Sequence, residues 1–127
     1  MTNTVPVLKD EDNQTPVPTV WRNTFRLIAE ALKEGDFKLN LRVSDARSIS
    51  AKDAAIITAN IRDYGDQLID LPDDTWSTSV CQWMLDYWEV YIDLFTANES
   101  ASDLVLAVRV YEDGTSYIYE VQSVHVP

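Results

Sequence analysis

The chain has 127 residues, of which 46% are hydrophobic and 24% are charged, and these values are typical of one globular domain with its own core. Ten Lys and Arg residues against 21 Asp and Glu residues give a net charge of −11. This charge repels phosphate backbones and anionic lipids, so it argues against binding to nucleic acid or to a membrane surface. It attracts basic proteins, although an acidic surface also serves simply to keep a small protein soluble.

The composition also favours a cytoplasmic location. The single cysteine, Cys81, cannot form an intrachain disulfide, which is more common in a reducing compartment. The first ten residues have no basic segment followed by a long apolar run, so they do not resemble a signal peptide. No apolar stretch reaches the roughly 20 residues that a membrane helix needs.

Two helices are predicted in the first half of the chain, after a flexible tail formed by residues 1–18, and residues 19–127 are expected to form the single domain. Thr19 is a candidate N-cap for the first helix, and Gly35 is expected to end it in the left-handed conformation. Ser50 is expected to cap the second helix, and Gly65 to end it. The apolar residues at helical spacing are Trp21, Phe25, Ile28 and Leu32 in the first helix, and Ala54, Ile57, Ile61 and Tyr64 in the second.

The second half of the chain has the alternation of β-strands. Apolar residues recur at every second position over 88–95 and 104–110, Asp113-Gly114 predicts a hairpin turn, and 117–126 is expected to be the last strand. A short strand is also expected over Phe37–Val43, and Trp76–Leu85 fits either a helix or a strand, with a strand favoured. Helices first and strands last predict an α+β fold, with two N-terminal helices packed on a C-terminal antiparallel sheet of three to five strands.

No residue pattern predicts a catalytic, cofactor or metal site. The single His125 and single Cys81 cannot form a metal cluster, and nothing in the sequence brings them together as a catalytic pair. The three glycines are too far apart for a phosphate-binding loop. The acids Asp93, Glu99 and Asp103 lie around one predicted loop, where they are either solvated side chains or, less favoured, a cation site or the paired carboxylates of an enzyme.

Aromatic residues are the remaining functional candidates. Five of them crowd the segment from Trp76 to Tyr91, where they form part of the core or line a pocket or interface. If Trp88 faces inward, strand parity turns Tyr91 and Phe95 outward. The candidate interaction surface therefore comprises Tyr91, Asp93, Phe95, Glu99, Ser102 and Asp103.

A signature over residues 88–106 resembles that of an uncharacterised bacterial family, one of the domains of unknown function. The matching positions are Trp88, Val90, Asp93, Leu94, Thr96, Glu99, Ser102, Asp103, Leu104 and Leu106, with further matches at 16–18, 21–22, 35–36, 64–65, 71–73 and 125–126. At the loop, Ala97-Asn98 and Ser100-Ala101 replace the acidic, Gly and Arg residues that are more usual in that family. The resemblance implies a bacterial, cytoplasmic, single-domain protein, and it implies no activity. Independently of the family, Ser102 and Asp103 are suited to bind loop amides and fix the turn.

Three functions are consistent with these features. The first is a non-enzymatic interaction protein, similar to an immunity or inhibitor protein, which binds a basic partner. The second is a small-ligand or regulatory domain with an aromatic-lined pocket between helices and sheet. A carboxylate-based enzyme is the third and least favoured.

Overall fold

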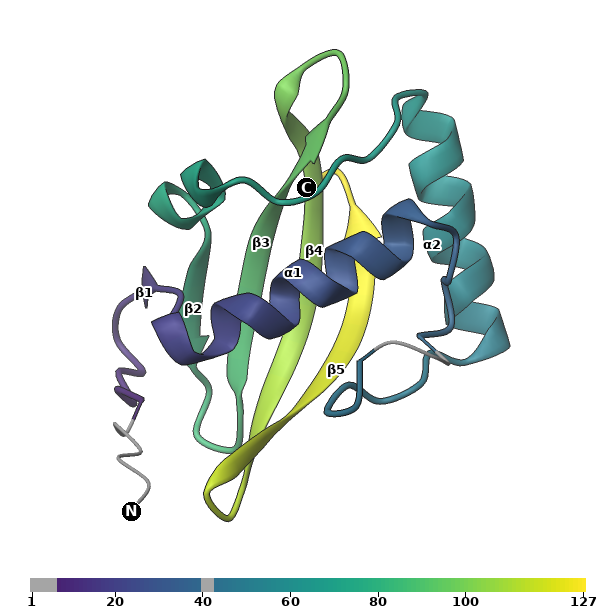
Figure 1. Ribbon diagram of the computed structural model, residues 1–127. Helices are drawn as coiled ribbons and strands as arrows, with labels where there is room; N and C mark the ends of the chain where they lie inside the picture. The colour runs from purple at the N-terminus through teal and green to yellow at the C-terminus, as the bar shows by residue number, and fades with distance from the viewer. Residues whose placement is uncertain (1–6, 40–42) are drawn as a thin grey trace.

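The computed structural model describes residues 7–39 and 43–127. Its elements are β1 (Thr15–Pro16), α1 (Thr19–Lys33), α2 (Ala51–Tyr64), the 3-10 helix η1 (Asp73–Ser77), β2 (Val80–Trp83), β3 (Trp88–Thr96), β4 (Ser100–Asp113) and β5 (Ser116–His125). The five strands form one antiparallel sheet in the order β1-β2-β3-β4-β5 (Figure 1). The α+β class and the helix-then-sheet order are as predicted. No helix in the described part of the chain is both long and apolar enough to cross a membrane.

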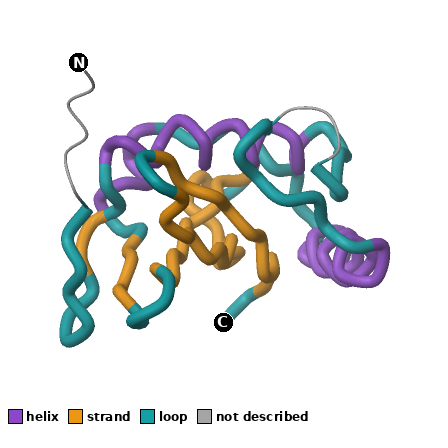
Figure 2. The backbone as a smooth tube through the Cα atoms, turned by 90° about the horizontal axis from the view of Figure 1, so that it is seen from below, coloured by secondary structure: helices purple, strands orange, loops and turns teal. Residues whose placement is uncertain are grey.

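The helix α1 crosses one face of the sheet, and α2 runs beside β5 (Figures 1 and 2). The contact between α1 and the sheet is largely aromatic. The ring of Trp21 meets that of Trp88 edge-on at 5.1 Å between centroids, and Phe25 meets Tyr119 in the same way at 5.5 Å. Such edge-to-face pairs add to the stabilisation that apolar burial provides. The core therefore lies between α1 and the face of the sheet that carries Trp88 and Tyr119.

The helices begin and end at the predicted residues, except at the start of α1. Pro18, and not Thr19, occupies the N-cap of α1, and no side chain caps this end. At the other end Gly35 has φ of 88°, its N–H donates to the Leu32 carbonyl at 3.1 Å, and the N–H of Asp36 donates to the Ala31 carbonyl at 2.9 Å. These two bonds are those of the Schellman motif.

The second helix is capped at both ends as predicted. Ser50 accepts a hydrogen bond from the Asp53 N–H at 3.1 Å, which pairs one of the donors that a helix leaves free at its N-terminus. Gly65 ends α2 with φ of 82°.

The strand predicted over Phe37–Val43 is wrong for residues 37–39 and 43, and residues 40–42 lie outside the described residues. Phe37 and Lys38 form a turn, and Leu39 has φ of 55°, which a strand does not allow. The alternation of apolar and polar residues gave a wrong prediction here, because Leu39 and Val43 are buried apolar residues of a loop, and such residues can alternate with polar ones without forming a strand. Further along the chain, the Asp45 carbonyl accepts from the Tyr119 N–H at 3.0 Å, and Ala46 forms an isolated parallel bridge with Tyr119.

The segment Trp76–Leu85 contains both kinds of structure. Its first residues belong to η1, and a strand, β2, begins only at Val80. The Thr75 hydroxyl donates to the Asp93 carbonyl at 2.6 Å and lies 2.9 Å from the Ser79 hydroxyl, so two buried polar side chains hold η1 against β3. The strands β3, β4 and β5 were predicted, although β4 begins four residues earlier than expected, and the predicted hairpin turn is formed with Gly114-Thr115 as its loop, since Asp113 pairs with Ser116.

Residues 7–16, which belong to the predicted tail, lie along the outer side of β2. Thr15 and Pro16 pair with β2, the Trp83 N–H donates to the Asp10 carbonyl at 3.3 Å, and the Trp88 indole N–H donates to the Leu8 carbonyl at 3.0 Å. The flexibility of residues 1–18, and the boundary between tail and domain, stay predictions.

We expect the contact of α1 with the sheet to dominate stability. Trp21→Ala should lower the free energy of unfolding by about 3–5 kcal/mol, because it removes a fully buried indole and leaves a cavity. Val20→Ala is the matched control on the same helix, and it should change stability by less than about 0.5 kcal/mol because Val20 is 56% exposed. Urea unfolding followed by circular dichroism measures both. Equal effects of the two substitutions would contradict this account of the core.

Candidate functional site

The face of the sheet opposite α1 is covered by no helix of the described residues (Figure 2). We call it the open face and define it by the side chains that alternate with those of the core. On the four longer strands these are Val80, Gln82, Glu89, Tyr91, Asp93, Val105, Ala107, Arg109, Tyr111, Ile118, Glu120, Ser123 and His125, of which Val105 and Ala107 are buried. Such a surface, made by several strands at once, is a candidate for binding.

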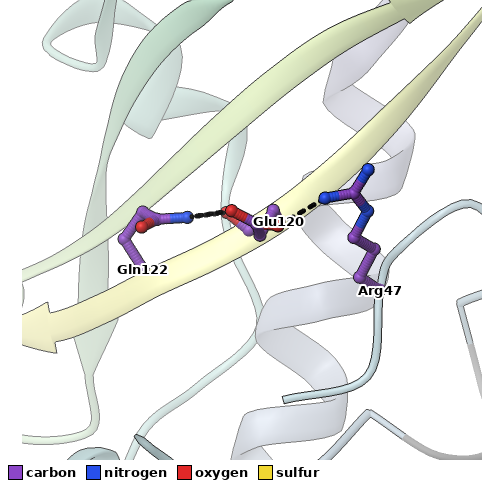
Figure 3. A network of polar contacts seen from close by, with 3 residues as sticks. All are labelled: Arg47, Glu120 and Gln122. Carbon is purple, nitrogen blue, oxygen red and sulfur yellow. Dashed lines mark hydrogen bonds and ion pairs between the residues drawn. The ribbon is translucent and has the colours of Figure 1, made fainter. Parts of the chain in front are cut away.

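A charged row crosses the open face. Glu89 pairs with Arg109 and Arg109 pairs with Glu120 on neighbouring strands, so a cation stands between two carboxylates. Glu120 also contacts Arg47 Nη1 at 2.6 Å and accepts a hydrogen bond from Gln122 Nε2 at 2.9 Å (Figure 3). Burial opposes ionisation of Glu120, but the bonds from Gln122 and Arg47 outweigh it and lower its pKa.

Arginine and tyrosine side chains stack beside this row. The Arg109 guanidinium lies 4.6 Å from the centre of the Tyr87 ring, and the Arg47 guanidinium lies 5.2 Å from that of Tyr111. The two rings are 5.6 Å apart. Cation–π contacts of this kind hold the rings in place, so the face presents ordered aromatic edges to a partner.

An apolar row follows next to the charged one. Val80 pairs with Tyr91, and Tyr91 pairs with Ala107. A shallow pocket of about 410 Å³ opens at this row, and its lining residues are Gln14, Val80, Tyr91, Val105, His125 and Pro127. The Nδ1 atom of His125 lies 2.7 Å from the Ser123 hydroxyl, so the pocket holds polar groups at one side of an apolar floor.

Both edges of the sheet are covered. β1 pairs with the outer side of β2, and Pro16 there has no N–H to offer a further strand. On the other edge, the Arg47 N–H donates to the Tyr119 carbonyl at 2.8 Å, and the Asn60 side chain of α2 donates to the Val124 carbonyl at 2.9 Å. These contacts leave few backbone groups at the edges for pairing with a further strand.

The structure separates the residues predicted for the interaction surface. Tyr91 and Asp93 lie on the open face and are partly buried. Phe95 is buried, with 8% of its surface exposed, so the exposed Tyr91–Phe95 patch is not formed. Parity fails because a register shift separates Asp93 from Phe95 along β3, and because the Ile69 N–H donates to the Phe95 carbonyl at 3.0 Å from the segment after α2.

The other three predicted residues lie at the β3–β4 hairpin. The Ser102 hydroxyl donates to the Leu94 carbonyl at 2.7 Å and accepts from the Leu104 N–H at 3.1 Å, so it binds strand residues of β3 and β4 and not the loop amides that were predicted. The Asp103 N–H, and not its carboxylate, makes the local bond, to the Tyr64 hydroxyl at 3.0 Å. That bond alone would lower the pKa of Tyr64, but a hydrogen bond to Glu99 and the charges of Glu99 and Asp103 raise it.

The remaining chemical candidates are not assembled. Cys81 and His125 lie on strands that are separated by β3 and β4, and burial raises the pKa of the Cys81 thiol. Within residues 7–39 and 43–127, no group of three or more His, Cys, Asp or Glu side chains is placed to hold a metal ion.

Sequence reasoning missed most of the open face. Arg109, Tyr111 and Glu120 alternate with core residues on β4 and β5, and this alternation was the available signal. It was obscured because Leu104 to Val108 is apolar throughout, so the two faces of β4 look alike in the sequence.

Comparisons with known proteins give one match. The model of a family described as Domain of unknown function (DUF7668) matches residues 29–127. Neither a curated protein nor a solved structure matches the chain.

The charged row predicts a pH-dependent contribution to stability. At pH 7, Glu120→Gln should lower the free energy of unfolding by about 0.5 kcal/mol, the usual size of a surface ion pair. Because the pKa of Glu120 in the folded chain lies below the ordinary 4.5, its contribution is present above that pH and is lost as the pH falls through the folded-state pKa. Urea unfolding at pH 7 and pH 3 should therefore show a smaller difference from wild type at pH 3 than at pH 7. Glu11→Gln, at an exposed glutamate outside the row, is the control, and an equal loss there would contradict the prediction.

Proposed function

The chain belongs to the DUF7668 family of domains of unknown function, and we propose that it is a non-enzymatic interaction module that binds a basic protein, in the manner of an immunity or inhibitor protein. The observation that carries the proposal is the open face, where partly buried tyrosines lie beside an apolar row on a sheet whose edges are covered. Aromatic residues on a rigid support are the usual anchors of protein interfaces.

The charge of the chain supports a basic partner. A net charge of −11 accelerates the approach of a cationic protein and disfavours anionic ones, including nucleic acid and membrane surfaces. On the open face itself Glu89, Asp93 and Glu120 outnumber Arg109. We place this binding in the cytoplasm, where a lone buried thiol such as Cys81 is common.

The pocket on the open face favours a second candidate, a small-ligand or regulatory domain. Its volume of about 410 Å³ falls within the range of small-molecule sites, and Tyr91 and His125 could orient a ligand over the apolar floor. It differs from the pocket expected between the helices and the sheet. A ligand that raises the melting temperature of wild type but not of Val105→Trp, which fills the pocket, would favour this function over the first.

The test of the first proposal compares two tyrosines. Tagged wild type, Tyr91→Ala and Tyr64→Ala are each used to purify partners at low salt from the cells that naturally make the protein. We expect wild type to retain a basic protein that is released as salt rises, and Tyr91→Ala to bind it at least about 10-fold more weakly, because an interface anchor is lost. Tyr64→Ala is the matched control, since Tyr64 is also partly buried but lies on α2.

Two results would contradict the proposal. One is that wild type retains no basic protein. The other is that Tyr91→Ala and Tyr64→Ala weaken the complex equally, since the loss would then reflect stability and not the open face.

A further inference from the structure

The turn between β2 and β3 has an unusual residue at its first position. Trp83 pairs with Trp88, and the Met84 N–H donates to the Tyr87 carbonyl at 2.8 Å, so Leu85 and Asp86 form a two-residue loop. Leu85 has φ of 75°, and Asp86 is not among the described residues with positive φ. A loop with positive φ only at its first position is normally built with glycine, because a β-carbon there is strained.

Burial does not compensate for this strain. Leu85 is 66% exposed, and the neighbouring Met84 is 40% exposed. Leu8, which is 65% exposed, lies beside the same hairpin because its carbonyl accepts the indole N–H of Trp88 at 3.0 Å. We call Leu8, Met84 and Leu85 the apolar tip. In the free chain the tip thus gains little from the hydrophobic effect while its backbone is strained at Leu85.

Acidic residues surround the apolar tip. Asp86 is in the turn itself, and Asp10 is held next to it by the bond from the Trp83 N–H at 3.3 Å. Glu112 of the neighbouring β4–β5 hairpin is brought to the same end of the sheet by Lys9, whose Nζ lies 2.7 Å from its carboxylate and 5.0 Å from the centre of the Trp83 ring. Lys9 and Glu112 thus neutralise each other, and Asp86 and Asp10 are the acids that remain next to the tip.

We propose that the apolar tip is an anchor that inserts into an apolar pocket of a basic protein, with Lys or Arg side chains around that pocket facing Asp86 and Asp10. The inference rests on the proposed function and specifies its partner: a cationic surface with an apolar hollow. A second copy of this chain does not fit, because its acidic residues would meet those of the first and each copy carries −11.

The geometry suits an anchor for two reasons. The two-residue loop is closed by the Met84–Tyr87 hydrogen bond, so Leu85 projects from a rigid support and little further ordering is needed on binding. The tip also continues directly into the open face through Tyr87, whose ring packs on Tyr111. An apolar anchor bordered by charged residues is the usual anatomy of a protein interface.

The test uses two matched pairs of variants. Leu85→Asn removes the anchor but keeps a residue that tolerates positive φ, and Ile56→Asn makes the same change at a 49% exposed position on α2. Asp86→Lys reverses a charge at the tip, and Asp63→Lys makes the same change at an exposed acid of α2. The probe is the basic-protein fraction of an extract of the producing cells, which a cation-exchange resin retains at low salt. This fraction is applied to each immobilised variant.

We expect the basic protein that wild type retains to bind Leu85→Asn at least about 10-fold more weakly and to bind Ile56→Asn as it binds wild type. Asp86→Lys should weaken the complex by a larger factor than Asp63→Lys. The proposed contact places Asp86 next to the partner, whereas Asp63 contributes only to the long-range attraction. The melting temperature of Leu85→Asn should equal or exceed that of wild type, because the strained leucine makes few contacts in the free chain.

The outcomes separate the two proposals. A basic partner that binds Leu85→Asn as tightly as wild type but is lost with Tyr91→Ala would overturn the anchor and leave the open face as the binding site. Equal effects of Asp86→Lys and Asp63→Lys would also overturn the local contact. A marked fall in the melting temperature of Leu85→Asn would show that Leu85 packs within the folded chain, which contradicts the inference. If wild type retains no basic protein, the proposed function fails and the anchor fails with it.

Discussion

The fold depends on the contact of a single helix, α1, with one face of a five-stranded sheet. Fifteen helical residues span about 22 Å, and five strands span about 19 Å, so α1 is just long enough to cross the whole sheet. Trp21 and Phe25 make this contact by packing against Trp88 and Tyr119. The second helix lies beside β5 and adds no second layer, so the chain has enough helix to cover one face and not the other.

The side chains of the open face are held in place by contacts with one another. Arg109 lies between Glu89 and Glu120 on neighbouring strands, and the rings of Tyr87 and Tyr111 stack with arginines. Such pairs stabilise a sheet modestly while keeping its surface polar enough for water. They also fix the positions of side chains that a partner would meet. The same arrangement therefore supports the fold and supplies the surface on which the proposed function rests.

The two ends of the sheet differ in what they present. At the β3–β4 hairpin, Ser102 and Tyr64 bind backbone groups, so local polar contacts hold the turn. Both hairpins contain a non-glycine residue with positive φ, Ser100 at 64° and Leu85 at 75°, but at the β2–β3 turn Leu85 and its neighbour Met84 are apolar and exposed. Under the proposed function such a position is tolerated, because stability and function are often exchanged at a binding surface. This contrast is the reason for assigning the anchor to one hairpin and not to the other.

The sequence by itself determined the class, the helices and most of the strands. Ser50, Gly35 and Gly65 mark helix ends through local geometry, and Trp88 to Leu94 alternates because one side of β3 is core. Tertiary structure decided the rest. Phe37 to Leu39 turns although it alternates, and Phe95 is buried because a register shift breaks parity and the segment after α2 covers it. The open face was also decided in three dimensions, because Leu104 to Val108 is apolar on both sides, all five residues are buried, and only the placement of α1 determines which side faces the helix.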